Sequence, residues 1–201
     1  MKLSSIVLIT CLAGPVHAAP ETFDFKDPKG VNNAAFKLDA PLESISGHAT
    51  NVVGTVTFDP QAPAATSGKI VITSASLTLP STMQQGHMRG AQWLDVAKYP
   101  EITFASKTFK NVKTEGDTTT AEVTGDFTLK GVTKELTAPV KLTYLKDKLS
   151  ARVPGMQGDL LVIRSTFTIK RSDFNIQPGQ SEDKVSNDIE ITLSIAGAAA
   201  K

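Results

Sequence analysis

The stretch Ala121-Glu-Val-Thr-Gly-Asp-Phe-Thr-Leu129 decides the fold class, because its residues alternate between two kinds. Every second position from Val123 to Leu129 is apolar or glycine, and the positions before and between them are Glu, Thr or Asp. Successive side chains of a β-strand point to opposite faces, so this period of two predicts a strand with one face in a core and the other in water. Such half-buried strands are typical of antiparallel sheets.

The same alternation recurs before and after this stretch, with turn residues between the segments. It is found in the ranges 21–26, 52–58, 101–112, 136–144, 161–169 and 189–195. Phe36 and Leu38 mark another strand, which ends near Pro41. Residues 69–79, which are rich in β-branched side chains, predict a further strand that runs to Pro80. Antiparallel strands joined by short turns form a sandwich or a barrel, and periodicity does not decide between the two. No shift in composition marks a domain boundary, so residues 19–201 are expected to form one all-β domain.

Two positions predict irregular strands. In the range 101–112, Phe109 is out of phase with Ile102 and Phe104, which predicts a β-bulge between them. In the range 136–144, Pro139 lacks the N–H group that a ladder needs, which predicts a sheet edge or a bulge at that point. The sheet is therefore not expected to be regular along its whole length.

One segment departs from the strand pattern: Gln-Gln-Gly-His-Met-Arg-Gly-Ala-Gln-Trp-Leu-Asp-Val-Ala-Lys-Tyr, residues 84–99. Met88, Trp93 and Val96 are spaced roughly as on one face of a helix. Pro100 ends the segment, because proline does not continue a helix. We predict a short helix here, inserted between strands as a lid or a plug.

Residues 1–18 have the features of a secretory signal peptide. Lys2 gives a positive start, residues 6–14 form a short apolar run, and Val16-His-Ala18 fits a small-residue cleavage site. The apolar run is too short to span a bilayer. We therefore predict cleavage after Ala18, export of residues 19–201, and no stable insertion into a membrane.

The charge and the cysteine content of the exported part argue against several classes of partner and site. The chain has 21 basic and 20 acidic residues, and loss of Lys2 with the signal peptide leaves 20 of each. A net charge near zero argues against nucleic acid as a partner and against an electrostatic membrane anchor. The one cysteine, Cys11, lies in the predicted signal peptide, so the exported part has no disulfide and no thiolate metal site.

Few side chains predict catalysis. No G-x-S-x-G, H-E-x-x-H or phosphate-binding glycine loop occurs, so no catalytic residue, metal site or cofactor is predicted. His87 and the adjacent Met88 leave haem or copper ligation open, although adjacent residues of a helix point in different directions. Arg171 follows a strand, and it either binds an anionic head group bidentately or pairs with Asp173 or Asp183.

Four stretches of the chain carry a resemblance to a known family. They are residues 54–59 (GTVTFD), His87-Met-Arg89 with 93–104 (WLDVAKYPEITF), 125–134 (GDFTLKGVTK), and Arg171-Ser-Asp-Phe174 with the strand of 185–195. In this order they resemble the YceI-like family of periplasmic lipid-binding proteins, over nearly all of residues 19–201. The resemblance implies a periplasmic location and a lipocalin-like antiparallel β-barrel of about eight strands. It also implies an apolar cavity for a polyisoprenoid, an isoprenoid quinone-like molecule or a related long-chain amphiphile.

Together, the apolar inner faces, the insert and the resemblance predict a lipid-binding or carrier protein rather than an enzyme. Aromatic residues of the inner faces are expected to line the tail cavity: Phe104, Phe127, Tyr144 and Phe167. Residues of the helical insert are expected to cover it: Met88, Trp93 and Leu94. Basic residues are expected to meet the head group: His87, Arg89 and Arg171. The alternatives are a solid core filled by the same aromatics, a small enzyme acting in the cavity, and a haem or redox-associated protein that uses His87 or Met88.

Overall fold

The alternating stretch 121–129 lies in strand β8 (Thr118–Leu129), which pairs with antiparallel neighbours on both sides, β7 (Glu101–Glu115) and β9 (Val132–Leu145). Phe127 and Leu129 are buried, whereas Glu122 is exposed, so the predicted alternation is confirmed. The structure, a computed structural model, describes residues 19–201. The predicted signal peptide lies outside the described residues, and its cleavage stays a prediction.

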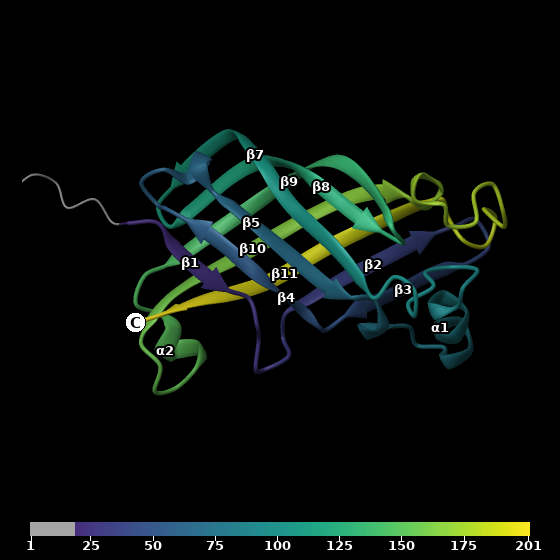
Figure 1. Cartoon of the computed structure of the whole chain (residues 1–201), viewed down its shortest axis with the longest axis horizontal. Coiled ribbons are helices and arrows are strands. Elements are labelled where there is room, and N and C mark those ends of the chain that lie inside the picture. Colours follow the sequence, from purple (N-terminus) through teal and green to yellow (C-terminus); the bar gives the residue numbers. More distant parts are fainter. Residues whose placement is uncertain (1–18) are drawn as a thin grey trace, which may run out of the picture.

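Eight strands close into an antiparallel barrel (Figure 1). Of the two architectures that the periodicity allowed, the fold is therefore the barrel and not the sandwich. Around the barrel their order is β1, β4, β5, β7, β8, β9, β10 and β11, and β11 pairs back to β1 through Ala198 and Asp24. The bounds not yet given are β1 (Glu21–Asp24), β4 (Val52–Phe58), β5 (Ser67–Thr73), β10 (Gly158–Lys170) and β11 (Asp188–Ala200). Closure gives each of these strands a neighbour on both sides and encloses the apolar faces.

Three further strands extend the sheet from β11. β2 (Asn33–Asp39) pairs with the first half of β11, β3 (Ser44–Ala49) pairs with β2, and β6 (Leu77–Thr78) pairs with β3. β11 thus changes partner from β2 to β1 along its length. At the point where the partner changes, the Asn32 side chain forms hydrogen bonds to the backbone. The buried Asn32 amide donates to the carbonyls of Phe25 (3.0 Å) and Ala196 (3.1 Å), and its oxygen accepts from the Ala196 N–H (2.8 Å). The side chain replaces ladder hydrogen bonds that a continuous strand would make.

The helices lie at the two ends of the barrel. They are α1 (Thr82–Arg89) and α2 (Leu149–Arg152), with three 3-10 turns, η1 (Pro63–Ala65), η2 (Ser74–Ser76) and η3 (Arg171–Phe174). α1 and the loop of residues 175–187 lie at one end, which we call the mouth, and α2 and the C-terminus lie at the other, the base (Figure 1). Within residues 19–201, no helix has the length and apolar character that crossing a bilayer requires.

The predicted helix of the insert is present but short. It ends at Arg89, because Gly90 takes an extended conformation (φ −69°, ψ 166°), and residues 91–94 and 96–98 form turns. The expectation that Trp93 and Val96 share a helix face with Met88 is therefore wrong. We call residues 79–100, between β6 and β7, the insert.

The strand predicted for 69–79 is also shorter than expected, since β5 ends at Thr73. Ser74 is buried, its hydroxyl donates to the carbonyl of Tyr99 (2.9 Å), and its N–H donates to the carbonyl of Pro100 (2.8 Å). These bonds to the end of the insert turn the chain out of β5 before it re-enters the sheet as β6. The interruption depends on a contact between residues far apart in sequence, so β-propensity does not reveal it.

Both predicted irregularities are present. The β7–β8 register shifts between Ser106 and Thr108 and again between Lys110 and Lys113. The β9–β10 ladder joins residues 141–145 to 160–164 and stops close to Pro139. There the Pro139 carbonyl accepts a hydrogen bond from the Ser165 hydroxyl (2.6 Å) in place of a ladder bond. Pro139 thus lies where β9 becomes an edge.

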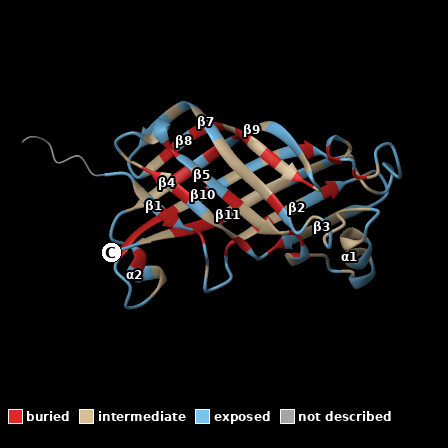
Figure 2. Cartoon of the chain, in the orientation of Figure 1, coloured by how far each residue is buried: buried red, intermediate tan, exposed pale blue. Residues whose placement is uncertain are grey.

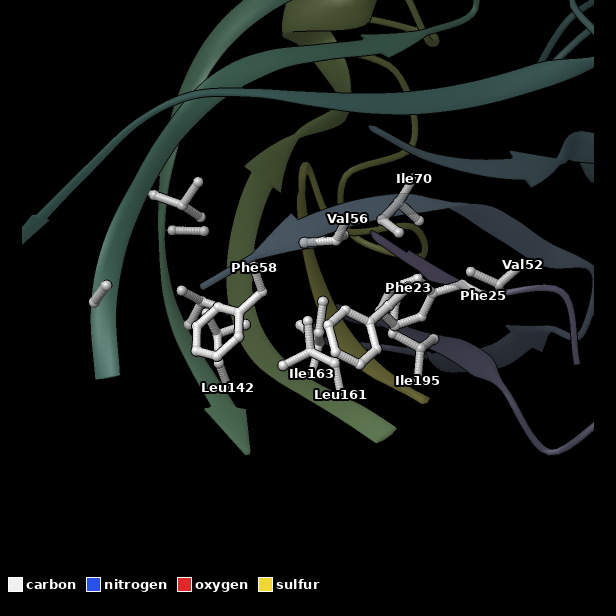
Figure 3. Packing of buried hydrophobic residues seen from close by; sticks show 14 residues of the cluster. Phe23, Phe25, Val52, Val56, Phe58, Ile70, Leu142, Leu161, Ile163 and Ile195 are labelled. Carbon is white, nitrogen blue, oxygen red and sulfur yellow. The ribbon is translucent and has the colours of Figure 1, made fainter. Parts of the chain in front are cut away.

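The barrel interior holds two clusters of buried apolar residues. One, toward the base, includes Phe23, Phe25, Phe58, Leu142, Leu161 and Ile195 (Figure 3). The other, toward the mouth, includes Leu77, Ile102, Phe127, Ile169, Phe174 and Ile176, and residues of the insert pack against it. Buried residues follow the barrel strands, whereas α1 contains none (Figure 2). The insert therefore covers the mouth and is not part of the core.

Candidate functional site: an apolar cavity in the barrel

The two clusters do not fill the barrel. A cavity of about 220 Å³ is lined by residues of both clusters and of the insert. Most of the lining side chains are aliphatic or aromatic, and Arg171 is the one charged side chain among the described residues that line the cavity. The interior is therefore hollow and apolar, not solid.

Seven of the ten predicted site residues meet at this cavity. They are Phe104, Phe127 and Phe167 from β7, β8 and β10, Met88, Trp93 and Leu94 from the insert, and Arg171 from η3. Tyr144, His87 and Arg89 lie outside the lining. Contact between any of these residues and a ligand stays a prediction.

Strand register brings the three phenylalanines together. Phe104 and Phe127 are directly opposite each other on β7 and β8, and the Phe127 and Phe167 rings meet edge to face with centroids 6.2 Å apart. Gly125 leaves the space that the Phe104 ring occupies, because a Cβ at position 125 would lie 2.7 Å from the tip of that ring and 2.4 Å from the Ala105 carbonyl oxygen. The aromatic wall of the cavity thus depends on a glycine in the neighbouring strand.

Side-chain hydrogen bonds are found at both ends of α1, and those at its C-terminal end join the insert to the sheet. Ser81 caps the helix by accepting a hydrogen bond from the Gln84 N–H (3.3 Å). Arg89, in the last turn, donates through Nε (3.2 Å) and Nη2 (2.7 Å) to the carbonyl of Leu77 in β6. Arg89 therefore holds the helix to the sheet, while His87 is exposed to solvent.

Arg171 is fully buried, and backbone carbonyls of the 175–187 loop surround it. Its five N–H groups donate to the carbonyl oxygens of Ile176, Gln177, Gln180, Val185 and Ser186. The Trp93 ring covers the guanidinium, with 5.8 Å between Cζ and the ring centroid. Burial lowers the pKa of Arg171, and the charge of Glu182 offsets part of that effect.

Arg171 therefore differs from both sequence-based interpretations of it. Within residues 19–201 it makes no ion pair with Asp173 or Asp183. Its donors face a loop and not a solvent-exposed rim. The one sequence signal of this arrangement is an arginine at a strand end, followed by a turn-rich loop (Asn-Ile-Gln-Pro-Gly-Gln, 175–180). This pattern does not predict which backbone carbonyls accept the hydrogen bonds of the arginine.

Tyr144 belongs to the base of the barrel and not to the cavity. Its ring packs against Phe23 and Phe58, and its hydroxyl donates to Asp159 (2.6 Å), a fully buried carboxylate. Burial alone would raise the pKa of Asp159, but hydrogen bonds from Tyr144, the Asp147 N–H and Lys201 outweigh it and hold that pKa at about 2. Burial raises the pKa of Tyr144, and Asp159 raises it further. Alternation placed Tyr144 on an inner face correctly, but it does not give the depth of a residue along the barrel.

Tyr144→Phe should destabilise the protein by about 2 kcal/mol at pH 7, because a buried carboxylate loses a hydrogen-bond donor. The depressed pKa of Asp159 contributes stability above its unfolded value of 3.8, and that contribution is lost as the pH falls toward 2. The difference from wild type should therefore shrink in urea melts between pH 4 and pH 2. Tyr99→Phe is the control, since no hydrogen bond of its hydroxyl is found in the described part of the chain. A difference that stays constant over this pH range would contradict the assignment.

The comparisons with known proteins agree with the fold and with the resemblance of the sequence. A YceI-like domain model matches residues 25–197. Protein YceI of Escherichia coli O6:H1 (strain CFT073) is 34% identical over 149 residues, which cover 74% of this chain and 71% of that protein. The crystal structure of Burkholderia cenocepacia BcnA is similar with a TM-score of 0.65 at 24% identity, covering 82% of this chain and 94% of that one.

A further solved structure, a polyisoprenoid binding domain from Saccharophagus degradans, has a TM-score of 0.64 at 12% identity and covers 90% of this chain and 99% of that one. At these identities the two structures show a shared fold. The domain match spans most of the chain, and the Escherichia coli relative is similar over about three quarters of it. The chain therefore belongs to the YceI-like family.

Proposed function

We propose that this protein binds and carries a long-chain amphiphile, a polyisoprenoid or an isoprenoid quinone-like lipid, with the lipid tail in the barrel cavity. One observation carries the proposal: the cavity is lined by aliphatic and aromatic side chains of the barrel and of the insert. Each methylene group that leaves water for such a surface contributes about 0.8 kcal/mol, so a long chain binds without a charged contact. The polyisoprenoid binding domain of Saccharophagus degradans, which has the same fold, supports this class of ligand.

We infer a periplasmic location for this carrier. Its support is the signal-peptide pattern of residues 1–18 and the resemblance to a family of periplasmic proteins. Cell fractionation with an intact-mass measurement tests this. A chain that stays in the cytoplasm with Met1 retained would contradict it.

A binding role is favoured over catalysis by the chemistry of the lining. No His, Asp or Glu is found among the described residues that line the cavity, so its serine and threonine hydroxyls have no adjacent general base there. Of the two residues that leave haem ligation open, Met88 lines the cavity, whereas His87 is exposed and outside the lining. Absorption spectra of the purified protein test the haem alternative directly.

The test of the carrier proposal is the lipid content of the protein. The protein should be purified without detergent and extracted with organic solvent, and the extract should be analysed by mass spectrometry. We expect a long-chain lipid in near-stoichiometric amount. A protein that carries no lipid and binds none on reconstitution would refute the proposal.

Ala138→Phe should plug the cavity and sharply reduce the lipid load. Ala138 is buried, lines the cavity and lies opposite Val123 on β8, so a larger side chain extends into the empty space. We expect a cost of at most about 1–3 kcal/mol in stability, because the cavity accepts the ring. Thr137→Phe is the matched control, since Thr137 is exposed on the outer face. A folded Ala138→Phe variant with a full lipid load would place the ligand elsewhere.

A further inference from the structure

The basic residues near the mouth have no free donor in the cavity. All five N–H groups of Arg171 donate to loop carbonyls, and the Trp93 ring covers its guanidinium. Arg89 lies outside the lining and donates to the Leu77 carbonyl. His87 is exposed and also outside the lining. The three residues predicted to meet a head group therefore place no unpaired N–H in the lining.

The hydroxyl groups of the lining are engaged in the same way. Three of them donate to backbone carbonyls: Thr66 to Pro63 (2.6 Å), Ser106 to Gly68 (3.2 Å) and Ser165 to Pro139 (2.6 Å). Of the other two, Ser67 is exposed, and Thr103 is out of phase with the inward-facing Ile102 and Phe104. A hydroxyl that has donated its hydrogen still accepts one. The Trp93 indole N–H is a further donor in the lining, and no partner for it is found among the described residues. Apart from this neutral donor, the lining offers a ligand hydrogen-bond acceptors and an apolar surface, and it places no unpaired charged donor there.

A phosphate or diphosphate head group needs the opposite surroundings. It is anionic and requires donors and positive charge, and burial without them is costly. A hydroxyl head group is uncharged and donates to acceptors such as the Ser165 oxygen. We propose that the bound lipid has an uncharged head group, such as a hydroxyl, and that the cavity selects it over the same chain ending in phosphate. This inference rests on the proposed function and narrows its class of lipid.

Trp93 provides the means to test this selection. It is the one tryptophan of the chain and lines the cavity, so its fluorescence reports binding there. Protein stripped of lipid should be titrated with three C20 isoprenoids that differ only in the head group: the alcohol, its monophosphate and its diphosphate, each below its micelle concentration. Mass spectrometry of the gel-filtered complexes gives a second measure. We expect the alcohol to bind at least tenfold more tightly than either phosphate.

The outcomes separate this inference from the proposed function. Phosphates that bind as tightly as the alcohol, or more tightly, would overturn the inference and leave the carrier proposal intact. Failure of all three lipids by both measures would overturn the carrier proposal, and the inference with it.

A charge added at the mouth tests the cause of the selection. Leu94→Lys supplies a free ammonium group in the lining, so the preference for the alcohol should fall at least threefold or reverse. Met83→Lys adds the same charge to the insert at an exposed position outside the lining, and it should leave the preference unchanged. If Leu94→Lys also left the preference unchanged in a folded protein, the absence of an unpaired positive charge in the lining would not be its cause.

Discussion

Phe127→Asp is expected to destabilise the protein by at least about 3 kcal/mol, whereas Thr128→Asp, one residue later, should change stability by less than about 1 kcal/mol. Phe127 is 6% exposed and packs edge to face with Phe167 and Phe174, with ring centroids 6.2 and 5.5 Å apart. An aspartate there would lose these contacts and place a carboxylate in an apolar interior that offers it no partner. Thr128 lies on the outer face, where its hydroxyl pairs with Thr133.

Urea melts at pH 7 provide the measurement, and the same melts at pH 3 provide a check on the cause. A carboxylic acid that is buried without a partner gains protons more readily in the folded protein. Its cost should therefore be smaller at acid pH, relative to wild type under the same conditions. Equal costs for the two aspartates at pH 7 would mean that the inner and outer faces of β8 are wrongly assigned.

The inward and outward faces of the strands could be predicted because they have a local cause. Each strand of the barrel has one dry face, so a period of two in the sequence gives the inward residues directly. This places Phe104, Phe127 and Phe167 on the inner wall. The same reasoning cannot place Tyr144, which also faces inward but lies beside Asp159 at the base. Depth along the barrel depends on which strands pair and in what stagger, and the alternation of one strand contains no such information.

The resemblance to the family predicted a barrel, and the structure confirms it. Periodicity alone could not predict the closure of the barrel, for a similar reason. β11 is paired by β2 along one half and approaches β1 at Ala198, and the Asn32 side chain bridges the change through Ala196, 164 residues away. In the sequence, Asn32 is a polar residue beside a turn. Its role depends on a partner that only the folded chain supplies. The position of Trp93 at the cavity could not be predicted either, because Trp93 reaches the cavity from a turn after α1 and not from a helix face.

Arg171→Met is expected to destabilise the protein by about 3 kcal/mol and to release the loop of residues 175–187 from the mouth. The substitution keeps an apolar stem of similar length and removes the five donors that hold the loop carbonyls. A buried carbonyl left without a donor costs about 1–3 kcal/mol, and exposure of the loop to water recovers part of this. A chain of this size loses about 2–4 °C in Tm for each kcal/mol.

Hydrogen exchange locates the effect. Amides of residues 175–187 should exchange faster in Arg171→Met, and so should those near Gln92, because the Gln177 side chain donates to the Gln92 carbonyl (3.1 Å) and joins the loop to the insert.

Arg164→Met is the matched control. Arg164 lies seven residues earlier in β10, is exposed, and donates through one nitrogen, Nη1, to the Ile163 and Ile195 carbonyls. Its loss should cost less than about 1 kcal/mol, within the range for a surface position. If the two methionine variants were equally stable and the loop stayed protected in both, the carbonyls around Arg171 would not depend on it, and its donors would be free to serve a ligand.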